Sequence, residues 1–150
     1  MVWLSDGCIS MKTVYIEKIF WYGDFSSPHY LNLKNAKIYR LDEVFPKFGL
    51  KSQKEIEESS DFVRLFYVDY NELVRDFIKL YDDDELTEAS KTWTDEEWFD
   101  VEFRRYIDGV VPLDDAWYDY EEDRLWEAAI KWCKENNIKY STKKFKWGRR

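Results

Sequence analysis

The chain has 150 residues, of which 45% are hydrophobic and 19% aromatic, and this composition excludes a wholly disordered protein. A domain of this size can fold around its own core without metal or disulfide support. The net charge of −8 is uneven. Residues 82–123 hold seventeen Asp and Glu against three Lys and Arg (net −14), whereas residues 139–150 hold six Lys and Arg and no acid (net +6). We therefore expect one domain at residues 13–138, with an acidic body, followed by a basic aromatic tail.

No stretch approaches the roughly 18 consecutive apolar residues of a membrane-spanning helix, so we expect no membrane association. The first ten residues lack the basic start and long apolar segment of a signal peptide. We interpret residues 1–12 as an extension, with Met11 as a second candidate start. The two cysteines, Cys8 and Cys133, lie far apart in sequence. Cys133 falls on an apolar helical stripe and is predicted to be a buried free thiol. A cytoplasmic location is the expectation.

The first half of the chain predicts strands. The β-branched and aromatic run at residues 13–22 indicates a strand. Residues 30–33 and 37–41 alternate apolar and polar side chains about Asn35, which is typical of a β-hairpin. Residues 42–60 favour two short helices, and residues 62–68 predict another strand.

Helices follow. Asp69 and Glu72 form a helix-start pattern, and apolar residues at helical spacing predict a helix ending near Tyr81. The aspartates at 82–84 would oppose the negative end of that helix, so we expect them to start another one. Strands followed by helices predict an α+β fold, with an N-terminal antiparallel hairpin and a mainly helical second half.

The last third predicts a pair of packed helices. Thr94 and Glu97 form a capping box, with Trp93 and Trp98 at the spacing of a hydrophobic staple, so a helix is expected over residues 94–108. Gly109 and Pro112 are interpreted as its stop. A second helix is expected over residues 120–136, ending in a left-handed residue at Asn136–Asn137. We expect the two helices to pack together, with Phe103 and Trp132 in a shared core.

Six short stretches of the second half stand in a specific order and spacing: Val74–Ile78, Phe103–Tyr106, Trp117–Tyr118, Asp123–Leu125, Ala129–Trp132 and Glu135–Ile138. In these stretches the chain resembles a small acidic bacterial family designated only as an uncharacterised protein family. The family has Phe where Tyr106 stands and Gly where Asn137 stands, and it has a Tyr-Leu-Asp-Leu hairpin like Tyr30–Leu33. The resemblance covers residues 30–138 and implies kinship of fold and no activity.

Catalytic patterns are scarce in this sequence. The single histidine, His29, follows Pro28 in an expected loop, and no pattern in the sequence indicates the other members of a catalytic triad. Cys and His do not occur at metal-ligand spacing, and the five glycines are scattered rather than gathered in a phosphate loop. We interpret the abundant acids as a solvated face, so no catalytic residue, metal or cofactor is predicted.

The candidate site consists of Arg104 and Arg105 with Trp117 and Tyr118. In the structural interpretation, one arginine pairs with Glu121, Glu122 or Asp123 and joins the two helices. In the functional interpretation, the arginines and aromatics bind a phosphate, a carboxylate or a peptide acid.

The tail interleaves aromatics with cations, as single-stranded nucleic-acid binders do. The remaining 138 residues carry −14 and would repel a polyanion, so we favour a tail folded back on the protein, with a last β-strand as one form.

Three functional hypotheses remain open. The first is a non-enzymatic protein-binding or regulatory module, as a homodimer or with another protein, because eight tryptophans exceed what a small core usually needs. The second is an enzyme or binder for a small anion at Arg104 and Arg105. The third is mimicry of nucleic acid by the acidic belt.

Overall fold

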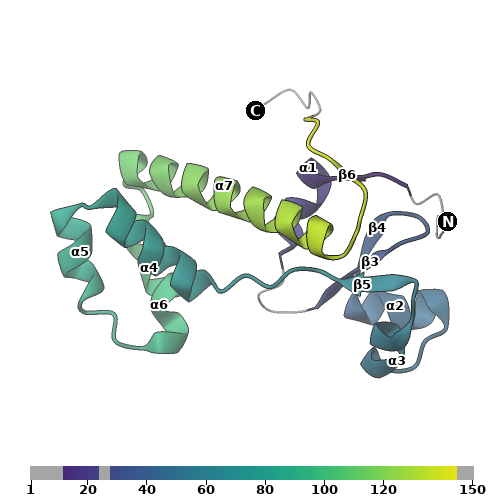
Figure 1. Cartoon of the computed structure of the whole chain (residues 1–150). Helices are drawn as coiled ribbons and strands as arrows, with labels where there is room; N and C mark the ends of the chain where they lie inside the picture. The colour runs from purple at the N-terminus through teal and green to yellow at the C-terminus, as the bar shows by residue number, and fades with distance from the viewer. Residues whose placement is uncertain (1–11, 24–27, 145–150) are drawn as a thin grey trace. The chain divides into compact units, whose positions relative to one another are not determined.

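The computed structural model describes residues 12–23 and 28–144 (Figure 1). Its contacts group into two units: unit 1 contains residues 1–67 and 125–150, and unit 2 contains residues 68–124. The α+β prediction is confirmed, because a hairpin-based antiparallel sheet precedes a mainly helical second half. The expectation of one domain over residues 13–138 stays a prediction. Among the described helices, none has the length and apolar character needed to span a membrane.

Unit 1 is built on the predicted hairpin. Strands β3 (His29–Asn32) and β4 (Lys37–Arg40) pair antiparallel, and β5 (Phe62–Arg64) adds to the other edge of β3, giving the order β4-β3-β5. The predicted strand over residues 62–68 is thus shorter than expected. Ala36 takes a left-handed φ of 60° in the turn. His29 lies in β3 and contacts the Tyr22 ring, so the loop predicted for it is wrong.

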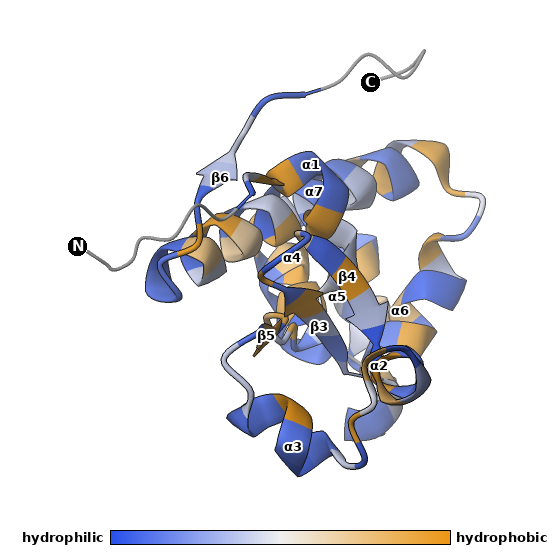
Figure 2. Ribbon diagram, turned by 90° about the vertical axis from the view of Figure 1, so that its right-hand side faces the viewer, coloured by the Kyte–Doolittle hydropathy of each residue, from blue (hydrophilic) through white to orange (hydrophobic). Residues whose placement is uncertain are grey.

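Both short helices predicted after the hairpin are present as α2 (Leu41–Phe48) and α3 (Gln53–Glu58). Figure 2 shows α3 as hydrophilic except for one hydrophobic segment, which agrees with Ile56 being its only buried residue. These helices cover a core against the sheet. That core contains Tyr30, Val44, Ile56 and Phe62.

The long strand predicted at residues 13–22 is wrong. Only β2 (Val14–Tyr15) is extended, and the chain continues as α1 (Ile16–Ile19) and the 3₁₀ turn η1 (Phe20–Tyr22). A short run of apolar and aromatic residues does not distinguish a strand from a buried helical turn. Burial rather than β-propensity explains this run, because Ile16, Ile19 and Phe20 are all buried.

The start of the tail does fold back as a strand. β6 (Tyr140–Ser141) pairs in parallel with β2, and the Val14 backbone N–H donates to the Lys139 carbonyl at 2.9 Å. The Lys144 ammonium lies 5.3 Å from the centre of the Trp126 ring. Residues 145–150 lie outside the described residues, and so do residues 1–11 of the extension predicted at residues 1–12, with Cys8 among them.

Unit 2 begins with α4 (Tyr70–Tyr81), whose start agrees with the sequence prediction. The Asp69 carboxylate accepts a hydrogen bond from the Glu72 N–H and so caps the helix. Asp82 ends it in a left-handed conformation, and Asp83 caps α5 (Asp84–Ser90), so the aspartates start a second helix as expected.

The next helix begins later than predicted. Asp95, rather than Thr94, accepts from the Glu97 N–H and starts the 3₁₀ turn η2 (Glu96–Trp98), which leads into α6 (Phe99–Ile107). Trp98 is 54% exposed, so the predicted Trp93–Trp98 staple is wrong. Trp93 instead packs edge-on against Phe99, with ring centres 5.5 Å apart.

The second helix of the predicted pair, α7 (Val111–Glu135), starts nine residues before the expected position. Gly109 turns the chain with a φ of 83°, but Pro112 lies in the first turn of α7, where the missing proline N–H has no cost. The left-handed end is confirmed at Asn137, with a φ of 55°.

Phe103 and Trp132 do not share a core. Phe103 belongs to unit 2, where its ring lies 4.9 Å from that of Trp117 on the first half of α7. Trp132 belongs to unit 1, where its indole N–H donates to the Arg64 carbonyl at 2.8 Å and its ring lies 6.1 Å from Phe66. Cys133 is buried as expected, and burial raises the pKa of its thiol to about 11.

Candidate functional site

The candidate site lies on unit 2, where α6 and the first half of α7 bring Arg104 close to Glu121. An Arg104 guanidinium nitrogen lies 3.2 Å from the Glu121 carboxylate. The Arg104 side chain is 47% exposed, whereas that of Glu121 is 8% exposed. The predicted ion pair between an arginine and the acidic stretch of α7 is therefore present.

Tyr70 completes this contact from α4. Its hydroxyl donates to the same Glu121 oxygen at 2.9 Å, and its ring lies 5.2 Å from the Arg104 guanidinium. Burial raises the pKa of Tyr70, and the negative charge of Glu121 raises it further. The phenol therefore keeps its proton at neutral pH and serves as a donor. Tyr70, Glu121 and Arg104 form one network that joins three helices.

The sequence predicted Glu121 as one of three candidate partners of an arginine, but it gave no sign that Tyr70 would join them. A signal for Glu121 was present, because Leu113, Trp117, Glu121 and Leu125 follow one another at intervals of four and so lie on one helix face. The other members of that stripe are buried, and Glu121 is buried with them at 6% exposure. A carboxylate on a buried stripe needs partners, and Arg104 and Tyr70 supply them.

Arg105, Trp117 and Tyr118, the other residues of the predicted site, differ from one another in exposure and in their partners. Arg105 is paired with Glu102 one turn away on α6, and its side chain is 72% exposed. Trp117 is 3% exposed and Tyr118 is 59% exposed, so these neighbours do not flank a cation in the same way. The Arg104 guanidinium does lie 5.8 Å from the centre of the Trp117 ring.

Arg104, Trp117 and Tyr118 meet at one hollow of about 150 Å³, and Arg105 is not among its lining residues. Trp117 and Ile107 supply buried apolar surface, while Asp108, Asp114 and Glu121 supply carboxylates. Three carboxylates against one guanidinium leave the lining with a net charge of −2. This hollow, termed the Trp117 hollow below, is thus partly apolar and electronegative.

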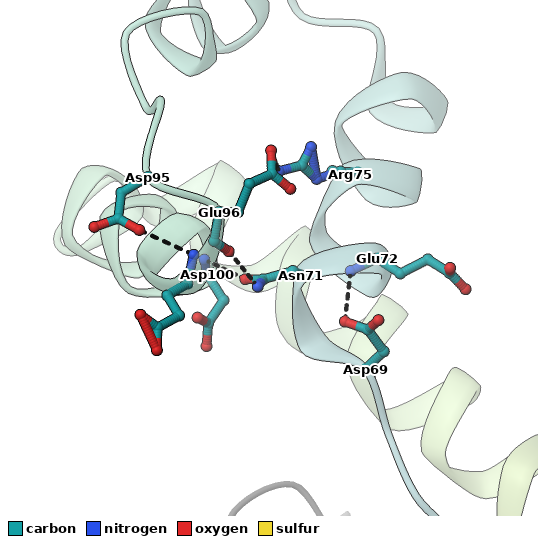
Figure 3. Close-up of polar contacts among 8 residues, drawn as sticks. Asp69, Asn71, Glu72, Arg75, Asp95, Glu96 and Asp100 are labelled. Atoms are coloured by element: carbon teal, nitrogen blue, oxygen red, sulfur yellow. Dashed lines mark hydrogen bonds and ion pairs between the residues drawn. The ribbon is translucent and has the colours of Figure 1, made fainter.

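A larger hollow of about 500 Å³ lies where α4 meets η2 (Figure 3). Asn71 joins the two elements: its side-chain amide donates to the Glu96 carbonyl at 2.6 Å and accepts from the Asp100 N–H at 3.0 Å. These bonds tie the start of α6 to α4. Two of the carboxylates around this hollow also have structural roles, because Asp69 caps α4 and Glu96 pairs with Arg75.

Among the described residues, no group of three or more His, Cys, Asp or Glu has the arrangement to hold a metal ion. Comparisons of the chain with protein-family models, curated protein sequences and solved structures gave no match. The resemblance to the uncharacterised bacterial family therefore stays a prediction, and the function has to be argued from the chain itself.

Proposed function

We propose that the protein is a non-enzymatic protein-binding module whose Trp117 hollow receives a lysine or arginine side chain of a partner protein. The observation that carries the proposal is the negatively charged lining above a buried tryptophan. A long basic side chain fits both properties, because its methylene stem packs on apolar surface while its charged end meets carboxylates.

The charges of the hollow support a cationic rather than an anionic occupant. Arg104, the one cation of the lining, is already paired with Glu121. Asp108 and Asp114 are the remaining charged groups, and both would repel a phosphate or a carboxylate. These charges argue against the hypothesis of a small anion bound at Arg104 and Arg105. The ligand that they favour is positively charged instead.

The surface around the hollow supports a macromolecular partner. Val110 is 44% exposed, Val111 66% and Tyr118 59%. Val111 and Tyr118 are seven residues apart on α7 and so lie on one face. Exposed apolar and tyrosine side chains beside a pocket are typical of protein interfaces, whose central contacts pack around such anchors.

The tryptophans contribute less to this surface than their number indicates. Among the five between residues 93 and 132, only Trp98 is exposed; Trp117 and Trp132 are buried, and Trp93 and Trp126 are half-buried. Their excess is therefore largely explained by packing. Mimicry of nucleic acid by the acidic belt stays a hypothesis.

The first experiment uses tripeptides as probes of the hollow. In ¹⁵N-edited NMR, acetyl-Gly-Arg-Gly-amide should shift the Trp117 indole and Asp114 backbone resonances, and acetyl-Gly-Glu-Gly-amide should not. Asp108→Asn combined with Asp114→Asn should weaken the response. Asp115→Asn with Asp119→Asn is the matched control, because both of these aspartates are exposed and neither lines the hollow. Equal shifts from both peptides would refute the assignment.

The second experiment seeks the partner. The photo-crosslinker p-benzoylphenylalanine placed at Tyr118 in producing cells should capture a protein, and the Asp108 and Asp114 substitutions should abolish the capture. The same crosslinker at Tyr67, which is 71% exposed in unit 1, serves as the control. Identical products from both positions would contradict a site at the Trp117 hollow.

A further inference from the structure

A different cleft of unit 2 gathers positive charge. Its volume is about 490 Å³, within the range of small-molecule sites, and α4, α5 and the chain leading into α6 line it. The lining includes three cations, two aromatic rings and a single carboxylate, that of Glu96. These cations and rings are Arg75, Lys79, Lys91, Trp93 and Phe99.

This concentration of cations stands out against the composition of the unit. Residues 68–124 contain twenty Asp and Glu but only six Lys and Arg, which gives a net of −14. Three of those six cations line this one cleft and leave its lining with a net charge of +2. An evenly solvated acidic surface would not collect half of its cations around one concave site.

The Arg75 guanidinium is oriented by the ring of Phe99. Its guanidinium lies 4.0 Å from the centre of the Phe99 ring, so the aromatic face orients it and leaves its N–H edges available for hydrogen bonds. One edge contacts the Glu96 carboxylate at 3.2 Å, and Figure 3 shows the two side chains pointing toward each other. The Glu96 side chain is 86% exposed, so this carboxylate can move into water when another anion arrives.

Lys79 makes fewer polar contacts than Arg75 or Lys91. It is exposed, and in the described ranges 12–23 and 28–144 no ion pair or hydrogen bond of its ammonium occurs. The negative end of α4 favours a cation there, but it does not explain why Lys91 lines the same cleft. The Lys91 ammonium contacts the Glu88 carboxylate at 2.6 Å, and the Glu88 side chain is itself 72% exposed.

The apolar part of the cleft restricts the ligand further. Trp93 is half-buried and Phe99 is 6% exposed, and their rings meet edge-on at 75°, so Trp93 supplies most of the accessible aromatic surface of the cleft. We propose that this cleft binds a small aromatic anion, a carboxylate or a phosphate ester. Arg75 and Lys79 hold the oxyanion in place of Glu96, and the ring of the ligand lies against Trp93.

Three probes test the site on the full-length protein: 1-naphthoate, 1-naphthyl phosphate and the uncharged 1-naphthalenemethanol. Calorimetry should show saturable binding of at least one of the two anions, and the anion that binds more tightly identifies the head group. NMR should place the ligand at the Trp93 indole. No saturable binding of either anion, or equal binding of the uncharged alcohol, would overturn the proposal.

Two substitutions should change the affinity in opposite directions. Lys79→Gln should weaken anion binding about three- to five-fold, the size of one exposed charge contact, and added salt should reduce this difference. Glu96→Gln should tighten binding about two- to five-fold, because it removes the competing carboxylate. Lys54→Gln, at an exposed position on α3, is the matched control. Equal dissociation constants for the Lys79 and Lys54 variants would refute the role of the cleft.

Discussion

The adjacent arginines of α6 provide a sharp test of the buried network, because only Arg104 has a buried partner. Arg104→Ala leaves the Glu121 carboxylate, 8% exposed, with the Tyr70 hydroxyl as its remaining partner in that network. Breaking a fully buried ion pair costs about 3–5 kcal/mol. Since 47% of the Arg104 side chain is exposed, water can partly replace it, and we expect a loss of about 1–3 kcal/mol in the free energy of unfolding.

Arg105→Ala is the natural control. Arg105 occupies the next position on the same helix, and it pairs with Glu102 in an exposed contact that should contribute about 1 kcal/mol or less. Urea denaturation at pH 7 would compare the two variants. A second substitution, Glu121→Gln, should restore part of the loss in the Arg104→Ala background, because it removes the unpaired charge. Equal small shifts for both arginines would show that Glu121 is solvated and that the network is wrong.

Two further predictions concern the C-terminal half of α7. Trp132→Ala should lower the free energy of unfolding by about 3–5 kcal/mol in urea denaturation, through the cavity and the lost hydrogen bond to Arg64, and a shift under 1 kcal/mol would mean that the indole is exposed. In a Cys8→Ser background, Cys133 should react slowly with a thiol reagent at pH 8 until urea unfolds the chain, since burial raises its pKa from 9.0 to about 11; rapid reaction of the native protein would contradict this.

The parts of the fold that the sequence predicted depend on interactions between near neighbours. The hairpin about Asn35 follows from alternation and turn residues, and the start of α4 follows from Asp69 and Glu72, three residues apart. Such signals act within a few residues, so they can be recognised in the sequence without knowledge of the tertiary structure. The same holds for the left-handed end at Asn137.

The errors arose where distant packing decides between local alternatives. Pro112 is compatible with both the end of one helix and the first turn of the next, and the chain uses the second. The β-branched run after Thr13 turns into α1 because its apolar residues are buried on a helical turn. The candidate site was predicted in part, since Arg104, Trp117 and Tyr118 do meet, but Tyr70 comes from another helix, 34 positions before Arg104 in the sequence.

The pairing of β2 with β6 has a consequence for the order of folding. Val14 pairs with Tyr140, so this contact closes a loop of 126 residues. Closing a loop costs conformational entropy, and the part of this cost that grows with loop length is about 4 kcal/mol here. For a hairpin turn of a few residues the same part is about 1 kcal/mol. Unit 2 consists of residues 68–124, and neither strand of this pairing belongs to it. The contacts of unit 2 therefore do not depend on closure of this long loop, whereas the β2–β6 pairing of unit 1 does.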